Sequence, residues 1–93
     1  MFEWDEAKSQ ANLERRGFDF EFATRVFDGD VLEHDDTRRE YGERRVVSIG
    51  EIDEEIFSVV YTWRGASRRI ISARHANRKE RNGYRKAFGK GNS

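Results

Sequence analysis

The stretch that decides the fold is IFSVVYTWRGASRRIISAR, residues 56–74. Two runs rich in β-branched and aromatic residues flank a short Gly-containing connection, which is typical of an antiparallel hairpin. A two-residue connection pairs Trp63 with Ala66, and a four-residue connection pairs Trp63 with Arg68. Both registers place the same side chains on each face of the hairpin. One face is therefore predicted to carry Phe57, Val59, Tyr61, Trp63, Arg68, Ile70, Ser72 and Arg74.

The two faces of this hairpin differ in chemistry. The second face, with Ile56, Ser58, Val60, Thr62, Arg69, Ile71 and Ala73, is mostly small and apolar, as expected beneath a layer of helices. The first face interleaves aromatic and arginine side chains. We expect this face to be uncovered, and an uncovered face of this kind forms a platform that stacks bases and holds phosphates. The alternative is that Tyr61 and Trp63 are rim or partner-interface residues with arginine stems packed over them.

Strand and helix signals continue on both sides of the hairpin. The runs VLEHDDTR (31–38) and RRVVSIG (44–50) predict two more strands, and together with the hairpin they predict a four-stranded antiparallel meander. Asp5 and Gly17 bracket an N-terminal helix, and Asp19 begins a shorter one. Asn77 and Glu80 match a capping box for a C-terminal helix. The expected fold class is α+β: two N-terminal helices, a four-stranded antiparallel sheet and a C-terminal helix.

Composition limits the class of protein. The chain has 93 residues and no cysteine, so we expect one small domain without disulfides, a thiol nucleophile or cysteine-bound zinc. No apolar run approaches the roughly 18 residues of a membrane span, and the N-terminus lacks the pattern of a secretory signal. We therefore expect a cytoplasmic protein with no membrane partner.

The formal net charge of zero hides a separation of charge along the chain. Residues 1–61 carry eight Lys/Arg against seventeen Asp/Glu, a balance of −9, and residues 62–93 carry ten against one, a balance of +9. A strongly basic segment points to a polyanionic partner, because the local potential attracts phosphate. The alternative is that the acidic and basic halves pair with each other across the fold.

Three segments are specific enough to suggest a family: FEWDEAK at the start, GERRVVSIG in the middle and VVYTWRGASRRIISARHANRKERNGY near the end. They resemble the BrnT family of bacterial toxins, from Phe2 to about Tyr84. The resemblance implies a RelE-like ribonuclease toxin. With the fraying expected of the last residues, GKGNS, we expect a single toxin domain over residues 1–88 and a disordered tail at 89–93. The resemblance also implies a BrnA-type antitoxin, a heterotetramer of two toxins and two antitoxins, and contact with DNA only through the antitoxin.

Metal-independent RNA cleavage requires a base for the 2′-hydroxyl, cations for the phosphorane-like charge and an acid for the 5′-oxygen. RelE-like toxins typically meet these needs with Arg, Lys, Tyr and Glu in a positive pocket. Four candidates also have a structural alternative: a solvated turn residue for Arg64, a strand-to-helix tie for Arg74, a core aromatic for Tyr84 and a helix cap for Glu80. Strand parity points His75 away from the face of Arg74 unless the strand has already ended. The catalytic candidates are Arg64 and Arg74 for charge stabilisation, and Tyr84, His75 and Glu80 for proton transfer.

Other basic and aromatic residues are candidates for binding RNA without catalysing its cleavage. No cofactor is expected. The cluster LEHDD (32–36) is a weak metal-site signal without a second nearby histidine, so no metal site is predicted. A non-catalytic module whose basic face binds RNA or receives an acidic antitoxin is the alternative function. The RNA-binding candidates are Arg44, Arg45, Tyr61, Trp63, Arg68, Arg78 and Arg81.

Overall fold

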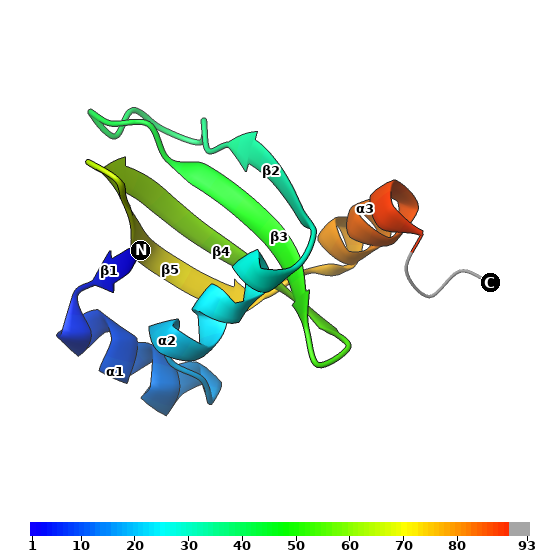
Figure 1. Ribbon diagram of the computed structural model, residues 1–93, viewed down its shortest axis with the longest axis horizontal. Coiled ribbons are helices and arrows are strands. Elements are labelled where there is room, and N and C mark those ends of the chain that lie inside the picture. The colour runs from blue at the N-terminus through cyan, green and yellow to red at the C-terminus, as the bar shows by residue number, and fades with distance from the viewer. Residues whose placement is uncertain (90–93) are drawn as a thin grey trace.

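The computed structural model describes residues 1–89 and shows an α+β fold built on a five-stranded mixed sheet with strand order β1-β5-β4-β3-β2 (Figure 1). The strands β2 to β5 form the predicted antiparallel meander. The elements are β1 (Phe2–Trp4), α1 (Glu6–Arg16), α2 (Phe20–Ala23), the 3-10 helix η1 (Thr24–Asp28), β2 (Val31–Asp35), β3 (Val46–Ile52), β4 (Glu55–Arg64), β5 (Ser67–His75) and α3 (Arg78–Phe88).

The prediction of a four-stranded, wholly antiparallel sheet is wrong by one strand. Residues Phe2–Trp4 form β1, which pairs in parallel with β5 so that Phe2 lies opposite Arg68 and Trp4 opposite Ile70. Three residues are too few to show an alternating pattern in the sequence. This strand forms because Phe2 and Trp4 pack against the main apolar core once the hairpin is in place.

The caps predicted from the sequence are present. The Asp5 carboxylate accepts hydrogen bonds from the backbone of Ala7 and Lys8, and Gly17 ends α1 at a φ of 89°. That left-handed conformation is costly for residues with a Cβ. Asp19 caps α2, which continues only as the 3-10 helix η1. At α3, Asn77 and Glu80 form the complete capping box.

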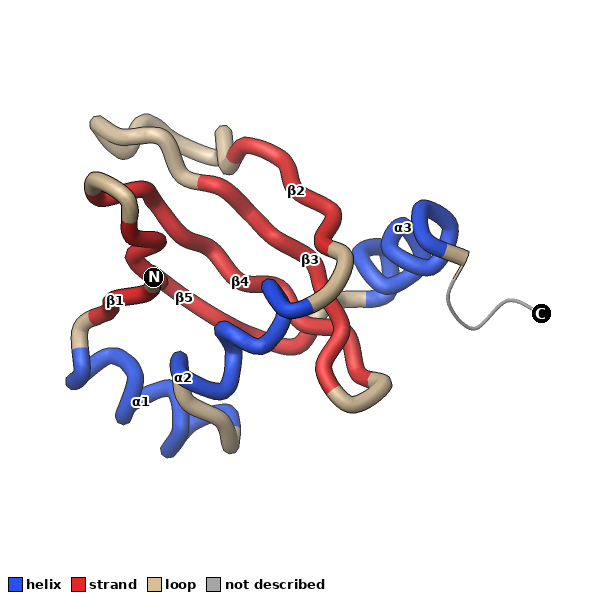
Figure 2. Tube along the Cα trace, in the orientation of Figure 1, coloured by secondary structure: helices blue, strands red, loops and turns tan. Residues whose placement is uncertain are grey.

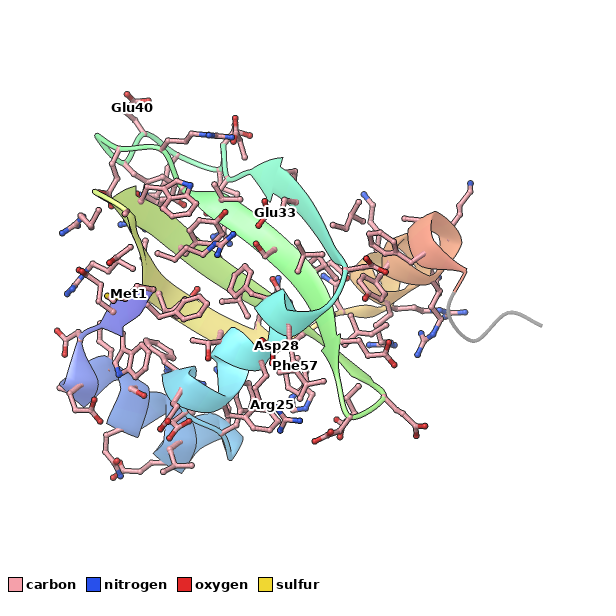
Figure 3. The ribbon with its side chains drawn as sticks, viewed as in Figure 1. Met1, Arg25, Asp28, Glu33, Glu40 and Phe57 are labelled. Atoms are coloured by element: carbon pink, nitrogen blue, oxygen red, sulfur yellow. The ribbon has the colours of Figure 1, made fainter. Side chains whose placement is uncertain are left out.

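The N-terminal helices cover the aromatic face of the sheet, so the prediction that this face is uncovered is wrong. Phe18 packs against Phe57 with ring centroids 5.1 Å apart, and Phe22 lies 5.7 Å from the same ring. Figure 3 shows Phe57 close to η1, the segment that carries Arg25 and Asp28. The large phenylalanines of residues 18–27 gain most by burial against large apolar partners, and the aromatic face supplies them.

A close approach at Gly50 allows this packing. A Cβ on Gly50 would lie 2.7 Å from the Cβ of Val26 in η1, which is closer than real side chains come. The absence of a side chain at this point of β3 lets η1 lie directly on the sheet. The backbone of η1 is thereby held against β3.

A β-bulge changes which residues of β5 share a face. Val60 pairs with Ser72, but the next residue, Tyr61, pairs with Ile70, so Ile71 is the extra residue. Because side chains alternate along a strand, the insertion moves Ser72 and Arg74 to the opposite face from Arg68 and Ile70. The prediction that Arg68, Ser72 and Arg74 share a face with Tyr61 is therefore wrong for Ser72 and Arg74.

The second face is partly covered by α3 through a smaller apolar cluster. Buried Tyr84 of α3 packs with sheet residues that include Val47, Ile49 and Val60. Figure 1 shows α3 set apart from α1 and α2. Within residues 1–89, no helix is long and apolar enough to cross a membrane. The predicted tail starts at Gly89, which is the C-cap of α3, and residues 90–93 lie outside the described part.

Candidate functional site

A cleft of about 210 Å³ lies on the face of the sheet that α3 partly covers. Its walls come from β2, β3, β4, β5 and the first turn of α3, so segments far apart in the sequence meet here. We call it the central cleft. Its lining residues are His34, Asp35, Asp36, Thr37, Arg38, Val47, Ser58, Val60, Ser72, Arg74 and Glu80.

Arg74 and Glu80 are joined at the junction of β5 and α3. The Arg74 Nη1 and Nη2 donate to the two carboxylate oxygens of Glu80 at 2.8 and 2.9 Å, and Nη1 also donates to the carbonyl of His75 at 3.1 Å. Bidentate pairs of this kind fix orientation as well as charge. The structure therefore ties the strand to the helix through Arg74, as one sequence-based alternative expected.

Glu80 is held ionised by its surroundings. Burial alone would raise its pKa, but the hydrogen bonds from Arg74 and from the Asn77 backbone outweigh burial, so the pKa of Glu80 lies below its usual value. Its side chain is 17% exposed, and it lines the central cleft while it completes the capping box. The Glu80 carboxylate thus caps the N-terminus of α3 and also lines the central cleft.

His34 is a cleft residue that the sequence did not single out as a proton-transfer group. It is exposed on β2 opposite Val47, on the face where Arg74 lies. Its positive charge when protonated contributes to the lowered pKa of Glu80. The alternation of residues in β2 could have shown from the sequence that Leu32 and His34 lie on one face of the strand. It could not have shown which residues of other elements lie near His34.

The outer wall of the central cleft is a compact ion pair. Two nitrogens of Arg38 donate to the two oxygens of Asp36, both at 2.8 Å, and the Tyr41 hydroxyl donates to the same carboxylate at 3.2 Å. The bonds from Arg38 lower the pKa of Asp36 to about 2, against the opposing effect of burial. Asp36 is therefore an ionised anchor of the loop after β2.

Three predicted catalytic residues, Tyr84, His75 and Arg64, are not among the residues that line the central cleft. The Tyr84 side chain is buried, and its hydroxyl donates to the carbonyl of Asp30 at 2.9 Å. Burial raises the pKa of Tyr84, with the nearby Glu51 and Asp30 acting in the same direction. His75 points to the opposite face, where its ring lies 4.7 Å from that of Phe57. The geometry of Tyr84 matches the core-aromatic alternative.

Arg64 lies far from the Arg74 site along the hairpin. Ser58 pairs with Arg74, whereas Arg64 pairs with Ser67, six residues further along β4. At about 3.3 Å per residue the separation is roughly 20 Å. Figure 2 shows the β4–β5 turn beside the loop that joins β2 to β3, at the end of the sheet opposite α3. There Arg64 lies 3.4 Å from Glu43 of that loop.

The predicted aromatic platform is largely buried. Tyr61 is 2% exposed, and its hydroxyl donates to Glu33 at 3.1 Å, so it offers no open ring for base stacking. Figure 3 shows Glu33 on β2. Trp63 is 46% exposed at the end of the same face. The guanidinium of Arg68 lies 4.9 Å from the Trp63 ring and 5.2 Å from that of Tyr61, which matches the alternative of arginine stems packed over aromatics.

The remaining RNA-binding candidates occupy separate places. Arg44 pairs with Asp35 at 2.8 Å, and Arg45 stacks 4.1 Å over the Tyr41 ring. Arg81 donates to the carbonyl of Ala76 at 2.9 Å, and Arg78 is exposed. Within residues 1–89, several cations of the basic C-terminal segment make no ion pair, so the acidic half neutralises only part of it. They are Arg68, Arg78, Lys79, Arg81, Arg85 and Lys86.

Comparison with known protein families gives a match over most of the chain. A family model described as "Ribonuclease toxin, BrnT, of type II toxin-antitoxin system" matches residues 4–80. No curated protein matches the chain. The match includes His34, Arg74 and Glu80 and ends within the first turn of α3. Across the described residues, no group of three or more His, Cys, Asp or Glu side chains is arranged to hold a metal ion.

Proposed function

The chain belongs to the BrnT family of ribonuclease toxins of type II toxin-antitoxin systems, and on this basis we propose that it cleaves RNA in the central cleft. The observation that carries the proposal is the meeting of His34, Arg74 and Glu80 around that cleft. A proton donor, a cation and an ionised carboxylate are what a phosphodiester transesterification requires.

The proposed reaction begins with attack of the RNA 2′-oxygen on the adjacent phosphorus. The 2′-hydroxyl proton passes to the Glu80 carboxylate, which lines the central cleft. The bond from phosphorus to the 5′-oxygen breaks, and protonated His34 donates a proton to that oxygen. The products are a 2′,3′-cyclic phosphate and a 5′-hydroxyl. An imidazole suits the donor role because it exchanges protons near neutral pH.

Arg74 stabilises the charge that develops on the phosphate. A guanidinium has five N–H donors. Two of them bind Glu80 and one binds the His75 carbonyl, which leaves two for phosphate oxygens. The same ion pair fixes the orientation of Arg74 at the central cleft. In this reaction Arg64 is too distant to share the phosphate that Arg74 contacts, and it is proposed as a contact to RNA further along the strand.

The test is cleavage of purified RNA in excess chelator by wild type and by His34→Gln, with identification of the ends produced. We expect cyclic phosphate and 5′-hydroxyl ends from the wild type and a large loss of rate in the variant. Products with 3′-hydroxyl and 5′-phosphate ends would contradict attack by the 2′-hydroxyl. RNA that is bound but stays intact would favour the non-catalytic binding module.

The partners follow from the same family. A ribonuclease toxin of a type II system acts on RNA and is paired with an antitoxin. We propose a BrnA-type antitoxin in a heterotetramer of two toxins and two antitoxins, in which only the antitoxin contacts DNA. Light scattering on the co-purified complex gives the mass directly, and a mass equal to one copy of each chain would overturn the stoichiometry.

A further inference from the structure

A second cleft, of about 460 Å³, lies between α1 and β5 and shares Ser72 and Arg74 with the central cleft. We call it the α1 cleft. Among the described residues, five cations line it and no carboxylate does. Its lining residues are Lys8, Ala11, Asn12, Arg15, Arg16, Phe20, Arg45, Ile71, Ser72, Ala73 and Arg74. We propose that the α1 cleft binds the phosphate backbone of single-stranded RNA next to the bond that is cleaved. This inference rests on the proposed function.

Helical spacing gathers the cations of α1 on one side. Positions 8, 11, 12, 15 and 16 recur every three or four residues, so Lys8, Arg15 and Arg16 share the face toward the cleft. The acidic residues of α1 lie elsewhere: Glu14 accepts from Gln10 at 3.3 Å, and Glu6 accepts from Trp4 at 3.0 Å. Within the described chain, Lys8, Arg15 and Arg16 make no ion pair.

Buried hydrogen bonds hold this cationic face in position. The Asn12 amide donates to the carbonyl of Phe18 at 2.9 Å, and the Ser9 hydroxyl accepts from the backbone of Phe20 at 2.9 Å. Both polar side chains are buried, so α1 is fixed against the segment that follows it. Cations on a fixed helix lose less conformational freedom on binding than cations on a mobile loop.

Arg45 reaches the α1 cleft from the opposite side. Its guanidinium is stacked over Tyr41 at 4.1 Å. Its Nε lies 3.5 Å from Glu43 but is buried without a hydrogen-bond partner among the described residues. The Arg45 side chain is still 27% exposed, so the rest of its guanidinium, oriented by the Tyr41 ring, can donate to a phosphate oxygen.

Arg74 lines both clefts and therefore marks the path of the RNA from one cleft to the other. An RNA chain whose scissile phosphate meets Arg74 in the central cleft can place neighbouring phosphates against Arg45 and the cations of α1. The in-line attack of a 2′-oxygen requires the backbone to leave helical geometry, which favours a single strand. Among the described residues, Phe20 is the one aromatic side chain that lines the α1 cleft, and it is buried, so the cleft holds phosphates and does not stack bases.

The experiment measures binding of a mixed-sequence, fully 2′-O-methylated RNA, which cannot be cleaved by 2′-attack, across a salt series. Lys8→Gln/Arg15→Gln/Arg16→Gln is compared with Lys79→Gln/Arg85→Gln/Lys86→Gln, which removes three charges from α3 residues that line neither cleft. Because each phosphate contact contributes about 0.7 to the salt slope, the α1 variant should lower it by about 2 and weaken affinity at low salt about tenfold or more. The control should change both quantities much less.

An equal loss in the two variants, or no loss in the α1 variant, overturns the inference. The inference is also overturned if the α1 variant loses affinity for an acidic antitoxin but not for RNA. Lys8→Gln alone guards against a folding artefact, because Lys8 is outside the last turn, where Arg15 and Arg16 complement the helix dipole. Cleavage of ordinary RNA by the wild type is scored separately. If the wild type cleaves RNA and the α1 variant binds RNA normally, the proposed function stands and the α1 cleft is not an RNA site. If the α1 variant binds RNA more weakly and the wild type cleaves none, the α1 cleft stands and the proposed cleavage does not.

Discussion

Arg74 at the end of β5 binds both carboxylate oxygens of Glu80 in the first turn of α3, at 2.8 and 2.9 Å. The pair joins three features that the sequence presents separately: the bulged strand, the capped helix and the central cleft. Glu80 also accepts from the Asn77 backbone at 2.8 Å, so one carboxylate serves both the helix start and the orientation of Arg74. Substitutions at these residues and around them distinguish the structural role of the pair from its proposed catalytic role.

Arg74→Lys should lower kcat about 10²- to 10³-fold, because a lysine keeps the charge but cannot bind Glu80 and phosphate through one planar group. The thermal midpoint should change little, since lysine can still pair with Glu80. RNA cleavage and thermal unfolding measured on the same sample test both statements. Arg25→Lys, at a cation paired with Asp53 at 3.1 Å away from both clefts, is the matched control. Equal rates for all three proteins would remove Arg74 from the mechanism.

His34→Gln should reduce the cleavage rate about 10²- to 10⁴-fold, the usual contribution of a positioned proton-transfer group. His75→Gln should retain most of the activity, because His75 lies on the opposite face against Phe57. The reverse ranking of the two histidines would place the proton donor on the face covered by α1 and α2.

Tyr84→Phe should lower stability by about 1 kcal/mol, since it deletes the hydrogen bond from the buried hydroxyl to the Asp30 carbonyl. Cleavage should persist, because that hydroxyl is already engaged in the core. Denaturant unfolding and an RNA cleavage assay distinguish the outcomes. A folded variant without activity would restore Tyr84 as the proton-transfer residue that the sequence suggested.

Asp36 should make stability fall in acid. Its folded pKa is about 2, lowered from 3.8 mainly by Arg38. A lowered folded pKa gives stability that is fully present above the unfolded value and is lost as pH falls from about 4 through 2. The contribution is about 1–2 kcal/mol after allowance for solvent around the exposed Arg38. Asp36→Asn should lose that amount at neutral pH and flatten the acid limb of the stability curve; superimposable curves would argue against the ion pair.

Gly50→Ala should destabilise the fold by about 1–3 kcal/mol, because the new Cβ would lie 2.7 Å from the Cβ of Val26. Gly83→Ala is the comparison, since there the nearest atom, in Leu32, is 3.8 Å away. In that helix alanine should be neutral or stabilising. Unfolding free energies of the two variants give the contrast directly, and equal values would mean that η1 does not lie tightly on β3.

Local signals in the sequence are sufficient for most elements. Asp5, Gly17, Asn77 and Glu80 each act within one helical turn, so α1 and α3 are predictable with their caps. The hairpin of β4 and β5 and the meander are predictable from alternation and turns. The separation of charge points to a polyanionic partner, and the BrnT motifs point to the family, because both are properties of the linear chain. Arg74 and Glu80 are candidates from the sequence, although their bidentate contact is not predictable from it.

Tertiary structure alone decided which face of the sheet carries the candidate site. The extra residue at Ile71 reverses the facing of Ser72 and Arg74, and a bulge depends on pairing across strands, which the sequence of β5 does not encode by itself. The same dependence explains β1, whose three residues form a strand only against β5, and His34, which meets Arg74 and Glu80 only after the sheet and α3 assemble. The sequence determined the elements and their charge, because these depend on near neighbours. The site depends on long-range pairing, so only the folded chain could place it.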